Sequence, residues 1–280
     1  MIRSADGSSP AIRAVDVVRS GGGDLSSDLV AVESPLEVRV NGLPFSVIMR
    51  TPGADRALTL GFLFSEGLAR HRGDVDRVDV DEATGVANAI FNRGRADAVA
   101  EALGQRRQVA MNSSCGLCGR RSLESLAINA PALAIDWSVD AALIDGLPAT
   151  LRSAQSAFAH TGGLHAAGLF DLEGRLDVSA EDVGRHNAVD KLLGHMLEAG
   201  RVPLGRSLLL VSGRSSFEIV QKAWLGGIPL VAAVSAPSSL AVDLAREAGI
   251  TLLGFVRDGR FNVYAHPDRV ARQAPIGGRW

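Results

Sequence analysis

The chain has 280 residues and a mass of 29.3 kDa, enough for one large domain or two modest ones. Hydrophobic residues make up 46% and charged residues 21%, as in ordinary globular proteins, and a net charge of -2 gives no general basic field for nucleic acid. No apolar run approaches the roughly 18 residues of a membrane helix, and the first 27 residues lack the apolar stretch of a secretory signal. We therefore expect a cytoplasmic protein that binds neither membranes nor nucleic acid.

The first half of the chain predicts an α+β unit. Apolar and polar residues alternate over Leu36–Val40, and the Asn41-Gly42 turn followed by Phe45–Met49 is a strong β-hairpin signal. Asp55 is expected to cap a helix that runs to about residue 67. Further elements expected in this half are strands over 75–80 and 86–91 and a helix near 96–103.

The second half alternates strands with helices, which is typical of a parallel or mixed sheet covered on both faces. Helices are expected over 147–158, 186–199, 217–225 and 239–248, and strands over 166–171, 176–178, 207–211, 229–234 and 251–255. The sequence therefore predicts a disordered tail (1–27), a smaller α+β domain (28–110), a cysteine loop (111–121) and an α/β domain (122–275).

The two cysteines of the chain, Cys115 and Cys118, lie in one Cys-Gly-Leu-Cys tetrapeptide. The thiolate is the reactive form of cysteine, and Arg120, Arg121 and a helix expected to begin near Ser122 all favour it. A second thiol nearby suits persulfide formation and release by exchange. A zinc half-site and a redox dithiol use the same residues, so residue chemistry alone leaves sulfur transfer, redox work and metal binding open.

Three loops of the second half have the composition of anion sites. Ser212-Gly213-Arg214-Ser215 stands between a strand and a helix, where backbone N–H groups and the Arg214 charge attract phosphate, and residues 235–239 repeat this arrangement after the next strand. Arg257 and Arg260 flank a turn and could clamp a phosphate. The alternatives are two ordinary serine-capped helices and a hairpin with solvated charges.

Two histidine-bearing segments complete the set of candidates. Residues 159–165 form a Gly-rich loop, in which His165 either faces a ligand or is a partly buried histidine with ordinary partners. His186 and Asp190 stand one helical turn apart, so Asp190 could orient the imidazole. Equally, Asp182 or Asn187 could only cap the helix.

Five motifs follow one another in the chain: Cys115-Gly-Leu-Cys118-Gly, Thr161-Gly-Gly-Leu-His165, Asp182-Val-Gly-Arg-His-Asn-Ala-Val-Asp-Lys191, Ser212-Gly-Arg-Ser-Ser-Phe-Glu218 and Gly254-Phe-Val-Arg-Asp-Gly-Arg260. In this order they resemble the FdhD family, the formate dehydrogenase accessory sulfurtransferases, over about residues 29–269.

The resemblance implies a fold and an activity. The fold would be similar to that of cytidine deaminases, a mixed sheet flanked by helices, with an added smaller domain. The protein would be a homodimeric sulfurtransferase that takes persulfide sulfur from a cysteine desulfurase. It would deliver this sulfur to the molybdenum or tungsten bis-guanine-dinucleotide pterin cofactor, which is then inserted into formate dehydrogenase.

The resemblance also implies roles for individual residues. Cys115 would carry the persulfide and Cys118 would assist it. The expected contacts to the cofactor, or to a GDP-like moiety in its place, are Phe255, Val256, Arg257, Asp258, Gly259, Arg260, Ser212, Gly213, Arg214, Ser215 and His165. The cofactor would be cargo, and we expect no metal site of the protein's own.

Other activities use the same segments. A zinc deaminase needs a His-x-Glu or Cys-x-Glu ahead of Pro-Cys-x-x-Cys. The chain has no His-x-Glu, and Ser114 stands where that proline would be, so deamination is not expected. A cofactor chaperone that does not transfer sulfur and a zinc-binding protein remain as alternatives.

Overall fold

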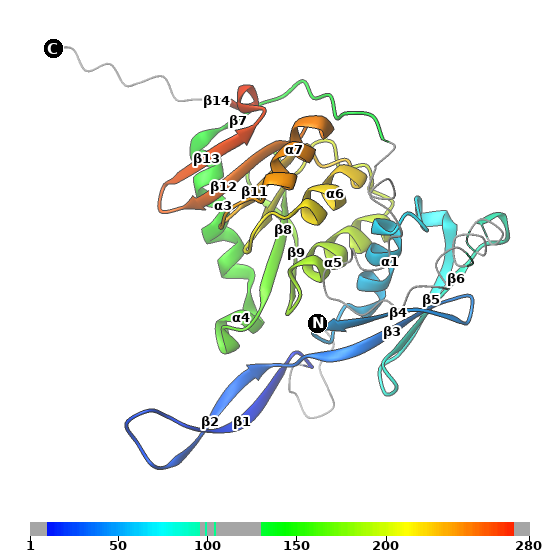
Figure 1. The fold of residues 1–280 in the computed structure, drawn as a ribbon, viewed down its shortest axis with the longest axis vertical. Helices are drawn as coiled ribbons and strands as arrows, with labels where there is room; N and C mark the ends of the chain where they lie inside the picture. Colours follow the sequence, from blue (N-terminus) through cyan, green and yellow to red (C-terminus); the bar gives the residue numbers. More distant parts are fainter. Residues whose placement is uncertain (1–9, 96–98, 100–103, 105–129, 272–280) are drawn as a thin grey trace. The chain divides into compact units, whose positions relative to one another are not determined.

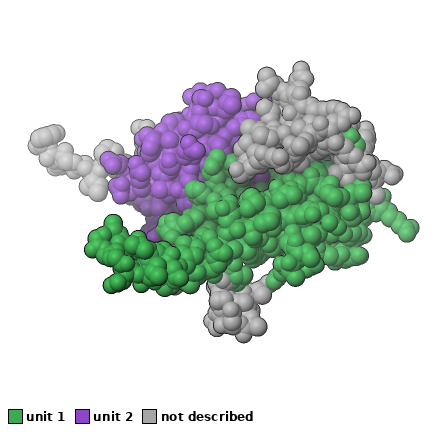
Figure 2. Space-filling model, turned by 60° about the horizontal axis from the view of Figure 1, so that its bottom comes forward, with its two compact units in different colours: residues 1–126, 155–165, 180–200 green, residues 127–154, 166–179, 201–280 purple. Residues whose placement is uncertain are grey.

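The computed structural model describes residues 10–95, 99, 104 and 130–271, and the chain divides into two compact units (Figures 1 and 2). Unit 1 comprises residues 1–126, 155–165 and 180–200, and unit 2 comprises residues 127–154, 166–179 and 201–280. Each unit is assembled from three separate stretches of chain, which differs from the continuous domains that the sequence predicts. None of the helices that the structure describes has the length and apolar composition of a membrane span.

Unit 1 contains two sheets. A two-stranded antiparallel sheet is formed by β1 (Ile12–Val18) and β2 (Leu25–Ala31), and a four-stranded sheet has the order β4-β3-β6-β5, with β3 (Ser34–Val40), β4 (Leu43–Arg50), β5 (Val75–Asp81) and β6 (Val86–Phe91). Its helices are α1 (Asp55–Ser65), α4 (Ser156–Thr161), α5 (Arg185–Glu198) and the short 3-10 helix η1 (Arg72–Asp74).

The hairpin of β3 and β4 is confirmed, and it turns through Asn41 and Gly42 at φ values of 50° and 83°. These positive φ values are those of the tight turn that an Asn-Gly pair favours. The predicted capping role of Asp55 is wrong. The N-cap of α1 is Ala54, and the Asp55 carboxylate accepts two hydrogen bonds from the buried Arg50 guanidinium at 2.9 and 2.8 Å.

Helices α1 and α5 cross in close backbone contact. A Cβ atom added at Gly61 would lie 1.8 Å from the Asp190 carbonyl oxygen, and one added at Gly194 would lie 1.9 Å from that of Ala57. Only glycine fits at either position, and the absence of two side chains lets the two helices pack at backbone distance. Because Gly61 and Gly194 come from distant parts of the sequence, this contact joins two separate stretches of unit 1.

The pair β1 and β2 lies largely within the stretch that the composition predicts to be disordered. Its turn contains Gly21-Gly22-Gly23, and most side chains of the two strands are at least partly exposed. Solvent-exposed strands with a glycine-rich connection have the composition of a disordered segment, which is why the sequence does not reveal them.

Unit 2 is built on a six-stranded mixed sheet of order β13-β12-β11-β10-β8-β9. Its strands are β8 (His165–Phe170), β9 (Leu176–Asp182), β10 (Leu208–Val211), β11 (Leu230–Ala233), β12 (Thr251–Arg257) and β13 (Arg260–Ala265), with β7 (Val139–Asp140) pairing β14 (Val270–Ala271) beside it. The helices are α3 (Ala141–Ala154), α6 (Phe217–Leu225), α7 (Ser239–Ala248) and the 3-10 helix η3 (Pro267–Arg269).

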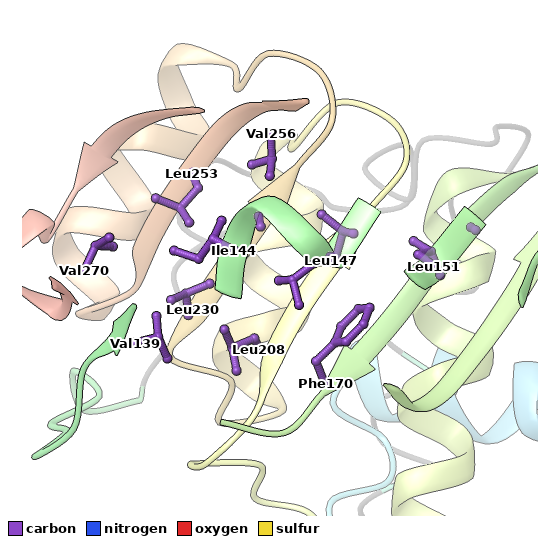
Figure 3. Packing of buried hydrophobic residues seen from close by; sticks show 13 residues of the cluster. Val139, Ile144, Leu147, Leu151, Phe170, Leu208, Leu230, Leu253, Val256 and Val270 are labelled. Carbon is purple, nitrogen blue, oxygen red and sulfur yellow. The ribbon is translucent and has the colours of Figure 1, made fainter. Parts of the chain in front are cut away.

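The core of unit 2 lies between α3 and one face of this sheet (Figure 3). Ile144, Leu147 and Leu151 of α3 pack over Phe170 and Leu208 of the strands, and all five side chains are buried. Strands β10, β11 and β12 are parallel neighbours, whereas β8 and β13 run antiparallel to their partners. The predicted α6 and α7 have the observed bounds, and α7 contacts β12 and β13.

Candidate functional site

Two loops of unit 2 lie side by side because the strands that precede them are parallel neighbours. One loop joins β10 to α6 and the other joins β11 to α7. Ser215 and Pro237 form a parallel bridge between the loops, and the Ser238 N–H donates to the Ser215 carbonyl at 3.0 Å. The Phe255 N–H donates to the Ser235 carbonyl at 3.1 Å, which joins the third predicted segment to this cluster.

The last residues of β12 have an unusual backbone. Phe255 has φ 56°, a left-handed conformation that bulky side chains rarely adopt. Gly254 allows this close approach, since a Cβ there would lie 2.9 Å from Cδ of Pro237. The Arg257 guanidinium lies 5.6 Å from the centre of the Phe255 ring, a cation–π distance. The loop cluster therefore presents an aromatic ring and a cation together.

Two exposed cations, Arg214 and Arg260, stand on these loops, and one carboxylate, Glu218, lies in the first turn of α6. Within the described residues, neither of these two arginine side chains forms an ion pair or a hydrogen bond. The buried Ser215 hydroxyl also has no hydrogen-bond partner there. The Ser238 hydroxyl caps α7 by accepting from the Ala241 N–H at 3.3 Å, whereas no side chain caps α6 at Ser216. An anion at α6 would meet free donors and cations.

The other residues of unit 2 that are predicted to contact the cofactor have roles in the structure of the sheet and its turns. Ser212 exchanges two hydrogen bonds of 2.9 Å with the backbone of Ala166, which fixes the start of its loop on β8. Val256 is fully buried in the core. Asp258 and Gly259, at φ 55° and 69°, form the turn into β13.

A buried ion pair organises the polar motif of unit 1. Asp182 and Lys191 lie 2.7 Å apart, with side chains 0% and 3% exposed. The Lys191 ammonium also donates to the carbonyls of Thr51 at 2.8 Å and Glu181 at 3.1 Å. Asp182 accepts from the N–H groups of Thr51 and Gly184 and from the Asn187 amide, so all its acceptor positions are used. These bonds join β4, β9 and α5, and Asp182 makes no side-chain cap to α5.

His165 lies beside this ion pair in unit 1. Burial lowers the pKa of His165 below 6.5, the positive charge of Arg185 lowers it further, and Asp182 acts in the opposite direction. Nε of Arg185 is buried without a hydrogen-bond partner among the described residues. A neutral imidazole next to a guanidinium can donate a hydrogen bond to an acidic ligand.

Two further sets of hydrogen bonds hold the segments that carry the histidines in place. The Glu181 carboxylate accepts from the N–H groups of Ala157 at 3.0 Å and Phe158 at 2.7 Å, so it holds the first turn of α4 ahead of His165. Asp190 accepts from the Ser65 hydroxyl at 2.6 Å. Sequence reasoning missed Glu181 and Lys191 as structural groups, because their partners are distant in the chain.

The cysteine loop, with Cys115 and Cys118, lies outside the described residues, as does most of the helix expected near 96–103. In the ranges that the structure does describe, no three His, Cys, Asp or Glu side chains are placed to hold a metal ion.

Comparisons with known proteins agree on one family. The FdhD/NarQ family model matches residues 31–271. "Sulfur carrier protein FdhD" of Streptomyces avermitilis is 46% identical over 275 residues, covering 94% of this chain and 96% of its own, and that of Thermoplasma acidophilum is 44% identical, covering 95% of each. A crystal structure of a protein assigned as a formate dehydrogenase accessory protein from Desulfotalea psychrophila superimposes with a TM-score of 0.73 at 28% identity, covering 93% of this chain and 98% of that one.

Proposed function

The chain belongs to the FdhD/NarQ family, and from this premise we propose that it is a sulfur carrier in the maturation of formate dehydrogenase. The observation that carries the proposal is the near full-length similarity to proteins named sulfur carriers, in a chain whose two cysteines form one Cys-x-x-Cys. In this proposal the protein acts in the cytoplasm as a homodimer. The similarity of its fold to that of cytidine deaminases stays a prediction.

The proposed first step is transfer of one sulfur atom from a cysteine desulfurase to Cys115. The Cys115 thiolate attacks the terminal sulfur of the desulfurase persulfide, a new S–S bond forms, and the desulfurase thiolate leaves. No oxidant is needed, because the sulfur is already in the persulfide state. In the proposed release, the Cys118 thiolate attacks the Cys115 sulfur, a Cys115–Cys118 disulfide forms, and sulfide leaves for the pterin cofactor; a cellular thiol reductant then reduces the disulfide for the next cycle.

The proposed binding site for the cofactor is the loop cluster of unit 2. The guanine dinucleotides carry phosphates, and Arg214, Arg260 and the uncapped start of α6 supply donors and positive charge for them. The Phe255 ring with Arg257 above it is a surface on which a flat heterocycle can stack. His165, which belongs to unit 1, stays a predicted contact to the cofactor.

Mass spectrometry of the chain after incubation with a cysteine desulfurase and cysteine tests the sulfur step. We expect the Cys115 peptide to gain one sulfur atom, and expect Cys115→Ala to abolish the gain and leave formate dehydrogenase inactive in cells. Ser113→Ala, in the same loop, is the matched control and should still load. Full dehydrogenase activity with Cys115→Ala would overturn the proposal.

A second candidate, a cofactor chaperone without sulfur transfer, is favoured by one observation. Among the described residues of unit 2, the loop cluster supplies an aromatic ring, Phe255, and two cations that have no ion pair there, Arg214 and Arg260. In that case a Cys115→Ala, Cys118→Ala double variant would keep cofactor binding and dehydrogenase activity, whereas Arg260→Ala would lose both. Metal analysis of the purified protein tests the remaining alternative, a zinc protein.

A further inference from the structure

Exposed apolar side chains are concentrated in three strands of unit 1. Seven large hydrophobic residues are exposed in the described part of the chain, and six of these belong to β1, β2 and β4. They are Val18, Leu25 and Leu29 in the β1–β2 pair, hereafter the arm (residues 12–31), and Leu43, Val47 and Met49 in β4. Apolar residues gathered in this way mark an interaction surface.

The arm is not a stable structure by itself. A lone two-stranded hairpin is at best marginally stable in water, because it has no second layer on which to bury its side chains. Within unit 1 the arm extends away from β3 and β4, and its β2 strand contacts α4 (Figure 1). Val18 faces Leu25 across the pair and Ala14 faces Leu29, so the exposed residues share one face of the arm. This apolar face would be stabilised by packing against another surface.

The two edges of the four-stranded sheet differ in a way that identifies a binding edge. Edge strand β5 carries Asp76, Arg77, Asp79 and Asp81, the charges that normally prevent another strand from docking. Edge strand β4 has a single charged residue, Arg50, which is buried and bonded to Asp55. Pro44 and a register shift interrupt the start of β4, whereas its outward positions Val47 and Met49 are apolar and carry no charge that would prevent another surface from docking.

The arm of a chain is poorly placed to cover its own β4. Only Val32 and Glu33 separate β2 from β3, so the arm continues away from the sheet rather than folding back over it (Figure 1). The strand lengths nevertheless match, with seven residues each in β1 and β2 and eight in β4. The arm and β4 of one chain therefore have complementary surfaces. These two surfaces can contact each other only when they belong to different chains.

We propose that two copies of this chain exchange their arms, with the apolar face of each arm packed on β4 of the other copy. The contact is the same in both directions, so a two-fold axis closes it and no further copies add. The arm and β4 together supply about the 20 to 30 residues per side that a standard interface uses. The inference rests on the homodimer of the proposed function and names the surface that forms it.

Sedimentation analysis of the full chain tests this dimer. We expect the wild type to have twice the 29.3 kDa chain mass. Leu25→Glu in the arm and Val47→Glu in β4 should each weaken dimerisation by at least about 100-fold, because each places two unpaired charges in an apolar contact. Leu240→Glu is the matched control, since Leu240 is the seventh exposed hydrophobic residue and lies in α7, so it should remain dimeric. A monomeric wild type, or Leu25→Glu and Val47→Glu variants as dimeric as the control, would overturn the inference.

Two single-cysteine variants test which surfaces meet. In a Cys115→Ser, Cys118→Ser background, Leu25→Cys in one chain and Val47→Cys in another should form a mixed disulfide when the two are combined and oxidised. Leu25→Cys chains that crosslink only with each other would contradict the arm-to-β4 contact.

Sulfur loading measured on the wild-type chain in parallel separates this inference from the proposed function. A chain that loads sulfur on Cys115 but sediments as a monomer contradicts the arm exchange alone. A chain that dimerises through its arms but never loads sulfur contradicts the sulfur-carrier function alone.

Discussion

At the scale of single residues, the buried pair of Asp182 and Lys191 has a strong energetic consequence. Lys191→Met leaves a carboxylate with 0% exposure without its cation, which should lower the free energy of unfolding by about 3–5 kcal/mol. Arg77→Met breaks the Arg77–Asp79 pair, whose side chains are 63% and 56% exposed, and should cost below about 1 kcal/mol. Urea unfolding of both variants measures the difference, and equal losses would contradict the role of this pair.

The His165 environment predicts a pH dependence. Burial and Arg185 lower the pKa of His165 from 6.5, so the unfolded chain binds its proton more readily than the folded one. The contribution of His165 to stability is therefore complete above about pH 6.5 and is lost as the pH falls toward the folded-state pKa. His165→Gln should remove this part of the pH dependence, and Arg185→Gln should raise the pKa of His165. NMR titration of the imidazole checks both, and an unchanged pKa in Arg185→Gln would show that Arg185 does not act on it.

At the scale of elements, the crossing of α1 and α5 is the most demanding contact. Gly61→Ala would push a methyl group into the Asp190 carbonyl, and it should lower the free energy of unfolding by about 3 kcal/mol or more. Gly146→Ala in α3 is the matched control, since a Cβ there meets nothing within 4 Å, and it should stabilise the protein by about 0.5–1 kcal/mol. Thermal unfolding compares the two.

Helix α4 depends on a carboxylate that is distant in the sequence. Glu181→Ala removes the acceptor for two N–H groups of its first turn, which should cost about 1 kcal/mol and speed hydrogen exchange over residues 155–165. Glu173→Ala, in an exposed turn, should leave exchange in that segment unchanged. If Glu181→Ala also left it unchanged, the cap would not hold the loop before His165.

The elements also show what the sequence could predict. Local patterns predicted α6 and α7 with their observed bounds, the Asn-Gly hairpin, and the neighbouring loops after β10 and β11. These patterns gave wrong predictions where the role of a side chain depends on a bonding partner outside the local pattern. Asp55 has the composition of a helix cap, but Arg50 takes its carboxylate. Asp182 also resembled a cap, and its partner Lys191 became evident only when β4, β9 and α5 came together.

At the scale of the whole molecule, the proposed function assigns sulfur loading and cargo binding to different residues. Arg214→Ala with Arg260→Ala should weaken binding of GDP, the probe for the cofactor, by about 10-fold or more, because two unpaired cations are lost. The same variant should still accept sulfur on Cys115. Isothermal titration with GDP and mass spectrometry of the Cys115 peptide measure the two tasks separately, and loss of both together would mean that they are not separable.

The glycine contact between α1 and α5 also matters during synthesis. Gly61 and Gly194 are far apart in the chain, so at ordinary translation rates α5 leaves the ribosome on the order of ten seconds after α1. Throughout that interval the backbone groove of α1 has no partner, and the apolar side chains around it face solvent. A nascent chain held in this state is a natural client for a chaperone, and messages truncated before α5 should yield aggregates rather than a smaller folded protein.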